Sequence, residues 1–151
     1  MIEVVRTRQI AAAPPDVWAV LADFGHISSW ARNVDHSVVI SAEADGVGAV
    51  RRIQTGRNTV LERVEAWEPT TMLSYSIEGL PPVVRSVTNT WRLVPEHDGS
   101  WVALTTSIQP GPRPPHQVAA RVVGRVLAKA SDQMLDGLSS ASVSAPREVV
   151  R

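Results

Sequence analysis

Residues 49–64 read AVRRIQTGRNTVLERV, in which two strand-like runs flank the pair Gly56-Arg57. Glycine is a preferred first residue of a type II′ turn, so this pair predicts a hairpin with a two-residue loop. In that register Arg51 lies opposite Glu62, and both side chains point to the same face of the hairpin. The other pairs on this face are Ile53–Val60 and Ala49–Val64.

The opposite face of the hairpin is far more polar. It holds Val50, Arg52, Gln54, Thr59, Leu61, Arg63 and Glu65. The face with Arg51 and Glu62 is therefore predicted to be the interior one, with one opposed Arg–Glu pair among small apolar residues. A turn longer by one residue would exchange the two faces.

The chain from Val38 to Ile108 continues this pattern as strands separated by turn signals, which is typical of an antiparallel sheet. The signals are Asp45-Gly46-Val47-Gly48, Gly56-Arg57, Glu68-Pro69, Gly79-Leu80-Pro81-Pro82 and Asp98-Gly99. Alternation predicts a common inward face that carries Leu73, Tyr75, Ile77, Val87, Asn89, Trp91, Leu93, Val102, Leu104, Thr106 and Ile108. Across the Asp98-Gly99 turn, Asn89 faces Thr106. Trp67 falls on an outward position and is predicted at the surface.

Helices are predicted before and after these strands in the sequence. Residues 2–10 read as a first strand, and Ala13-Pro14-Pro15-Asp16 opens a helix, followed by a short second helix that ends near Trp30. The proline-rich connector 110–115 stops the last strand, and a long helix is predicted from His116 to Leu138. Its polar face carries Arg121, Arg125, Lys129, Asp132 and Asp136, and its apolar side carries Val118, Val122, Val123, Val126, Leu127, Ala130, Met134 and Leu138. This order of elements predicts an α+β fold in which the helix lies on the concave side of the sheet.

Composition excludes several classes of protein. A length of 151 residues fits one domain, and fifteen basic residues balance fifteen acidic ones. This balance argues against a nucleic-acid-binding protein and against a polybasic membrane-surface module. The absence of cysteine removes disulfides and thiolate chemistry, and no apolar run is long enough for stable membrane insertion. We therefore expect a cytoplasmic domain.

No motif in the chain indicates a cofactor, a metal site or a catalytic triad. The histidines His26, His36, His97 and His116 show no metal-ligand spacing. The glycines near Gly46 lack the strand–turn–helix context of a phosphate-binding loop, and no nucleophile elbow is present. We expect neither a metal nor a cofactor.

The predicted interior contains more polar residues than a solid core would accept, namely Arg51, Glu62, Tyr75, Asn89 and Thr106. Each unpaired buried polar group costs about 1–3 kcal/mol, so these groups either pair with one another or line a cavity. Arg51 and Glu62 could anchor a ligand or form a structural ion pair, and the Tyr75 hydroxyl could bind a ligand or a local partner. For Asn89 and Thr106, a mutual hydrogen bond is the favoured interpretation.

Two tryptophans have open interpretations as well. Trp91 on the inward face and Trp30 on a short irregular segment could form an aromatic wall and a lid. Ordinary apolar packing is the alternative for both, and packing is expected for Trp18.

The chain from about residue 3 to 139 resembles the START-related helix-grip superfamily, in particular its polyketide cyclase/dehydrase-like branch. The resemblance rests on Ala13-Pro14-Pro15-Asp16-Val17-Trp18 with Leu21 and Asp23, on Gly48-Ala49-Val50-Arg51, on Leu61-Glu62-Arg63-Val64 and on Gly79-Leu80-Pro81. It implies a curved antiparallel sheet of six to seven strands around a long C-terminal helix, with a pocket between them. Residues 1–139 would form this domain, and residues 140–151 a flexible tail.

The leading functional hypothesis is a non-enzymatic domain that binds a small hydrophobic molecule, lipid-like or polycyclic. Arg51, Glu62 and Tyr75 would orient its polar end, with Asn89 nearby, while Trp30 and Trp91 would cover its apolar body. The alternative is an aromatase/cyclase that acts on a polyketide-like substrate, in which the Arg–Glu pair or the tyrosine polarises a carbonyl and assists dehydration. A third hypothesis is an interaction module whose groove receives a partner peptide, and the neutral charge of the chain gives it little support.

Overall fold

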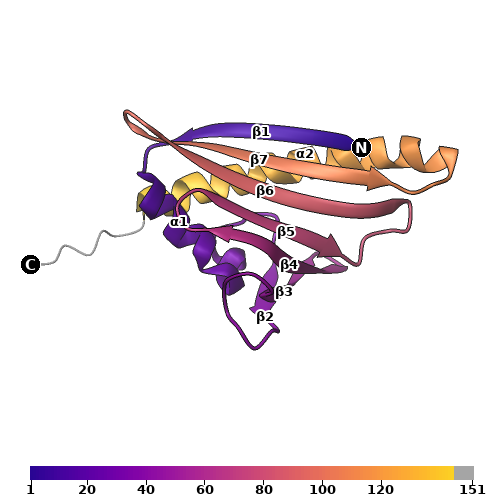
Figure 1. The fold of residues 1–151 in the computed structure, drawn as a ribbon, viewed down its shortest axis with the longest axis horizontal. Helices are drawn as coiled ribbons and strands as arrows, with labels where there is room; N and C mark the ends of the chain where they lie inside the picture. The colour runs from indigo at the N-terminus through magenta and orange to yellow at the C-terminus, as the bar shows by residue number, and fades with distance from the viewer. Residues whose placement is uncertain (145–151) are drawn as a thin grey trace, which may run out of the picture.

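A seven-stranded antiparallel sheet packed against a long helix makes up the computed structural model, which describes residues 1–144 (Figure 1). The elements are β1 (Ile2–Ile10), α1 (Pro14–Ala22), η1 (Phe24–Ser29), β2 (His36–Val39), β3 (Val50–Thr55), β4 (Asn58–Glu68), β5 (Met72–Glu78), β6 (Val84–Glu96), β7 (Gly99–Pro110) and α2 (Pro114–Ser144). This arrangement confirms the predicted α+β helix-grip fold, with η1 formed as a 3₁₀ helix.

The strand order β1-β7-β6-β5-β4-β3-β2 places the first two strands at opposite edges of the sheet. Strands β2 to β7 follow one another as neighbours, whereas β1 pairs with β7 at the far edge. The helices α1 and η1 make the connection between the two edges, and α2 packs against β1 and β7 (Figure 1).

The hairpin register predicted from Gly56-Arg57 is confirmed. Arg51 pairs with Glu62 and Ile53 pairs with Val60, while the backbone N–H of Val64 donates to the Ala49 carbonyl over 2.9 Å. Gly56 has φ of 59°, the left-handed conformation that a type II′ turn requires at its first position and that glycine adopts without strain.

One prediction from alternation is wrong, because β4 contains a bulge. Its register with β5 shifts between Val64 and Ala66, so the extra residue returns Trp67 to the inner face. Trp67 there packs edge-to-face on Trp18 of α1, with ring centroids 5.2 Å apart. The expected surface tryptophan is therefore part of the packing between the sheet and α1.

The long helix differs from its prediction at its end and along its apolar side. It continues to Ser144, so residues 140–144 are helical and not a tail, and the rest of the predicted tail lies outside the described residues. Toward its C-terminal end, Met134, Leu135 and Leu138 are buried. In the first half, Val118, Val122 and Val126 are more than half exposed, so the sheet does not cover this part of the predicted apolar side.

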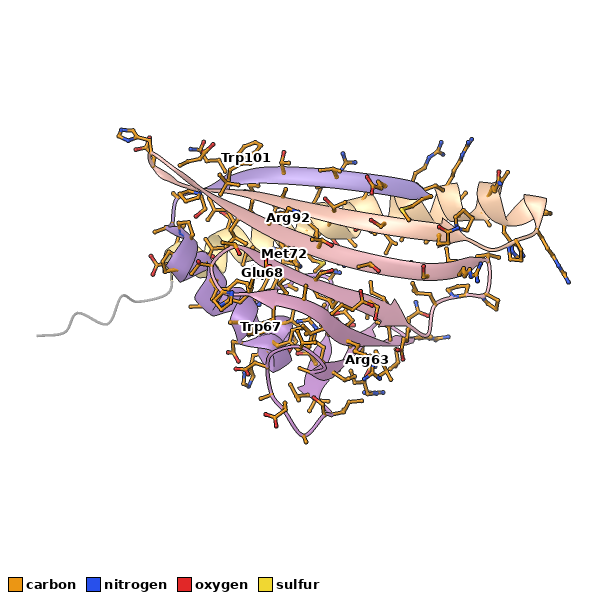
Figure 2. All side chains as sticks on the ribbon, in the orientation of Figure 1. Arg63, Trp67, Glu68, Met72, Arg92 and Trp101 are labelled. Atoms are coloured by element: carbon orange, nitrogen blue, oxygen red, sulfur yellow. The ribbon has the colours of Figure 1, made fainter. Side chains whose placement is uncertain are left out.

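The apolar interior has two parts. The larger cluster joins α1, η1 and the end of α2 to the inner face of the sheet, and includes Trp18, Trp91 and Leu138. A smaller cluster lies around Val87 and Ile108. Figure 2 shows Arg92, Met72 and Trp101 on the outer face of the sheet, which has α2 behind it. Within residues 1–144, no helix combines the length and apolar character needed to cross a membrane.

Candidate functional site

A cavity of about 480 Å³ lies between α2 and the inner face of the sheet. It borders both apolar clusters, because its walls include Ile53 and Met134 from the larger one and Leu80 and Leu127 from the smaller one. The polar groups on its walls include Glu62, Asn89, Thr106, Ser131 and Asn33. A concave apolar space with a few converging polar groups is typical of a small-molecule site.

Arg51 and Glu62 form a buried ion pair beside this cavity. Nε and Nη2 of Arg51 lie 2.8 and 2.7 Å from the same oxygen, Oε1 of Glu62, and Nη1 donates to the Phe24 carbonyl over 3.0 Å. The guanidinium also lies over the rings of Phe24 and Tyr75, 3.8 and 4.7 Å from their centroids, where these two rings meet edge-to-face. Each of the three guanidinium nitrogens of Arg51 therefore has a protein partner.

Glu62 is the member of the pair that reaches the cavity. Its side chain is 8% exposed and lines the cavity wall, whereas Arg51 lies behind it. Both bonds from Arg51 go to Oε1, and among the described residues no hydrogen bond reaches Oε2. An ionised carboxylate accepts several hydrogen bonds, so Oε2 can accept one from a ligand hydroxyl or from water.

A second polar network runs from the core to the cavity wall. Nε1 of Trp91 and Nδ2 of Asn89 both donate to the Tyr75 hydroxyl, over 3.2 and 3.4 Å. Thr106 Oγ1 donates to Asn89 Oδ1 over 2.7 Å, which confirms the predicted pairing of these two residues. Asn89 and Thr106 line the cavity, so a ligand can reach this end of the network. The other end, at Tyr75 and Trp91, is buried.

Burial and a nearby carboxylate change the acid–base behaviour of the single tyrosine. Desolvation raises the pKa of Tyr75 above its ordinary value, and the negative charge of Glu62 raises it further, while Arg51 opposes the shift. The phenol is therefore neutral at physiological pH and available as a hydrogen-bond group.

The six predicted site residues divide into two groups. Glu62 and Asn89 line the cavity, whereas Arg51, Tyr75, Trp91 and Trp30 do not appear on its walls within the described part of the chain. Arg51 and Tyr75 lie behind the wall and bond to Glu62 and Asn89, which form it, and Trp91 bonds to Tyr75. Trp30 packs edge-to-face on Trp91, with centroids 6.1 Å apart. Its segment lies against α2 at Gly137, where an added Cβ would be 2.0 Å from the Trp30 carbonyl oxygen.

Six polar wall residues were not predicted from the sequence: Ser131, Asn33 and, at the β3–β4 hairpin, Thr55, Arg57, Asn58 and Thr59. Ser131 is buried on α2, four residues after Leu127 and three before Met134, so helical spacing could have placed it on the apolar side. Asn33 lies between η1 and β2, where no periodicity exists, and its Oδ1 is buried without a hydrogen bond. Both add polar character to the cavity.

A second hollow, of about 370 Å³, lies between η1 and β2 and includes Asp23 and His26. These two side chains share a 2.6 Å hydrogen bond, which raises the pKa of His26. Both are exposed, and in residues 1–144 no three His, Cys, Asp or Glu side chains gather as a metal site would require. This hollow lacks the buried polar groups that distinguish the cavity under α2.

Comparisons with known proteins agree with this architecture. The family model described as "Polyketide cyclase / dehydrase and lipid transport" matches residues 1–142. The ZhuI aromatase/cyclase from Streptomyces sp. R1128 superposes with a TM-score of 0.81 at 19% identity, over 99% of this chain and 98% of that one. A search of curated proteins finds no match.

Two further solved structures share the fold. A protein from Thermobifida fusca has a TM-score of 0.79 at 23% identity, over 94% of this chain and 93% of that one. The di-domain aromatase/cyclase StfQ of the steffimycin pathway has a TM-score of 0.79 at 15% identity, over 95% of this chain and 51% of that one. At these identities the likeness concerns the fold alone.

Proposed function

The chain belongs to the polyketide cyclase/dehydrase and lipid transport family, and from this premise we propose that it binds a small hydrophobic molecule in the cavity under α2. The molecule is lipid-like or polycyclic, because the walls are mainly apolar. A volume of about 480 Å³ falls within the range of roughly 300–1,000 Å³ that is common for ligand pockets.

The free oxygen of Glu62 is the observation that carries this proposal. Oε2 is an accessible carboxylate oxygen on a mainly apolar cavity wall, and removing it from water is costly unless something donates to it; in the cavity that partner is a ligand hydroxyl or water. Asn89 adds a complementary group, because one of its two amide hydrogens goes to Tyr75 and the other remains for a ligand carbonyl. The preferred ligand therefore has an apolar body and an oxygen-bearing end.

Filling the cavity tests the binding function directly. We expect Ala130→Trp, which places an indole inside the cavity, to weaken binding of the neutral fluorescent probe N-phenyl-1-naphthylamine at least about tenfold. The matched control is Val143→Trp, which adds the same side chain at an exposed position of the same helix. Circular dichroism establishes that both variants are folded. Equal probe affinity in Ala130→Trp and the control would exclude the cavity as the binding site.

An aromatase/cyclase is the second candidate, and Glu62 also supports it. A carboxylate with one oxygen held by Arg51 and the other facing an apolar cavity is placed to take a proton from a bound substrate. The Tyr75–Asn89 network could polarise a substrate carbonyl at the same time.

Glu62→Gln separates the two candidates because it keeps the shape of the side chain and removes its negative charge. In a binding protein the affinity for a hydroxyl-bearing polycycle falls at least about tenfold, since a hydrogen bond to a charged group contributes about 1.5–3 kcal/mol. Circular dichroism checks that the variant is folded, because it also removes the charge that pairs with buried Arg51. An enzyme loses turnover and retains binding. Titration calorimetry and product analysis of a polyketide-like substrate measure the two quantities. Unchanged affinity and unchanged turnover together would remove Glu62 from the site.

A further inference from the structure

The side of the cavity that meets solvent carries a row of exposed valines. Val118, Val122 and Val126 are spaced four residues apart along α2 and are 67%, 55% and 64% exposed. Val122 and Val126 also line the cavity, so the row runs along its opening. Single exposed valines are ordinary on a protein surface, but three in one row beside an opening form a continuous apolar strip.

A row of cations lies directly beside the valines. Arg121, Arg125 and Lys129 are each offset by one residue from the spacing of the valines, and all three are exposed. The ion pairs of α2 in the described residues involve Asp132 and Asp136, which bind Arg6 and Arg8 of β1. The three cations of the first half therefore have no carboxylate partner among the residues that the structure describes.

The segment that contains the first half of α2 is basic although the whole chain has no net charge. From Gly99 to Ser131 the sequence contains no Asp or Glu, while Arg113 adds a fourth permanent cation just before α2. The β5–β6 loop completes the rim of the opening, because Leu80 and Pro81 line the same cavity as Val122 and Pro81 is exposed. A neutral net charge argues against an evenly basic surface, but not against this local one.

We propose that this mouth surface, consisting of Val118, Val122, Val126, Arg121, Arg125, Lys129 and residues 79–83, docks on membranes that contain anionic phospholipid. An apolar strip flanked by cations is the pattern of a helix that lies in a membrane interface, with its apolar side among the acyl chains and its cations at the headgroups. Docking in this orientation opens the cavity toward the bilayer, so an apolar molecule passes between them without crossing water.

The charge of the mouth surface also favours a lipid partner over a second copy of this chain. A symmetric dimer through the valine strip would bring two rows of Arg121, Arg125 and Lys129 together, and like charges at an interface are unfavourable. Anionic headgroups instead neutralise them. The surface is peripheral in this arrangement, which agrees with the absence of a membrane-crossing helix among residues 1–144.

Vesicle co-sedimentation tests the proposal without any knowledge of the bound molecule. The purified chain should sediment with vesicles of phosphatidylcholine and phosphatidylglycerol, much less with phosphatidylcholine alone, and less at high salt. Arg121→Glu with Arg125→Glu should lower the affinity for the anionic vesicles at least about 25-fold, since each basic residue near the surface contributes about a factor of five. Arg52→Glu with Arg92→Glu is the control, because it changes the net charge equally at two exposed positions of the sheet, and Figure 2 shows Arg92 on the outer face.

The apolar strip has its own matched pair of variants. Val118→Asp should weaken vesicle binding, whereas Val143→Asp, at an exposed position near the other end of the same helix, should not. Equal sedimentation with neutral and anionic vesicles, or equal losses in the test and control variants, would overturn the proposal. A chain that ignores both kinds of vesicle but binds an acidic protein through Arg121 and Arg125 would assign the surface to a protein partner instead. Because probe binding to the cavity is measured separately, either result leaves the proposed function standing.

Discussion

Replacing Arg51 with Met is expected to lower the free energy of unfolding by about 3–5 kcal/mol, the usual cost of removing one partner from a buried ion pair. The substitution leaves the Glu62 carboxylate at 8% exposure without its cation. It also removes the bond to the Phe24 carbonyl and the cation–π contacts with the rings of Phe24 and Tyr75. Urea denaturation followed by circular dichroism measures the loss.

The neighbouring residue supplies the control for this prediction. Arg52 is exposed on the outer face of the same strand, so Arg52→Met should change stability by less than about 0.5 kcal/mol. Adding Glu62→Leu to Arg51→Met should restore part of the loss, because no unpaired charge then remains in the interior. If Arg51→Met were as stable as the wild type, the pair would not be buried as the hairpin register requires.

Gly137→Ala is expected to destabilise the fold by about 3 kcal/mol, the upper end of the usual cost of overpacking. Its new Cβ would lie 2.0 Å from the carbonyl oxygen of Trp30, and this neighbour is backbone that cannot rotate away. Either α2 or the segment at Trp30 must then move. The change in tryptophan fluorescence on thermal unfolding gives the shift in Tm.

The same helix contains a second glycine, Gly124, at which substitution by alanine is expected to stabilise the protein. A Cβ at Gly124 would lie 3.6–3.9 Å from Ile108, Val4 and Ile2, which is ordinary van der Waals contact. Gly124→Ala should therefore stabilise the protein by about 1 kcal/mol, the difference in helix propensity between the two residues. Loss of stability in Gly124→Ala would contradict the room for a Cβ at that position, and no loss in Gly137→Ala would contradict the contact between Gly137 and Trp30.

The inner face of the sheet was predictable from sequence because short turns fix the register of antiparallel strands. The type II′ turn at Gly56 sets the Arg51–Glu62 pair, and the turn before Gly99 sets Asn89 opposite Thr106. These pairs follow from local chemistry, since alternation and turn type determine which side chains share a face.

The features that the sequence did not predict depend on contacts between distant segments. The bulge between Val64 and Ala66, which turns Trp67 inward, has no glycine or proline to mark it. Asn33 reaches the cavity only because the loop between η1 and β2 is packed against the end of β3. The gap that leaves Val122 exposed exists because the helix contacts the sheet mainly at β1 and β7, so that the cavity separates the middle of α2 from strands β3 to β5. The hydrophobic pattern of α2 alone does not show which part of the helix the sheet covers.

The placement of the first strand at the edge next to β7 also determines when the sheet can be completed. Ile2 pairs with Ile108, so β1 has no partner until nearly all of the sheet has been synthesised. Strands β2 to β7 can pair in sequence with neighbours that have just emerged, whereas the contact between β1 and β7 closes a loop of about a hundred residues at a correspondingly large entropic cost. During translation β1 therefore stays unpaired until β7 has been synthesised, and the groove that receives α2 is complete only when these two strands have paired.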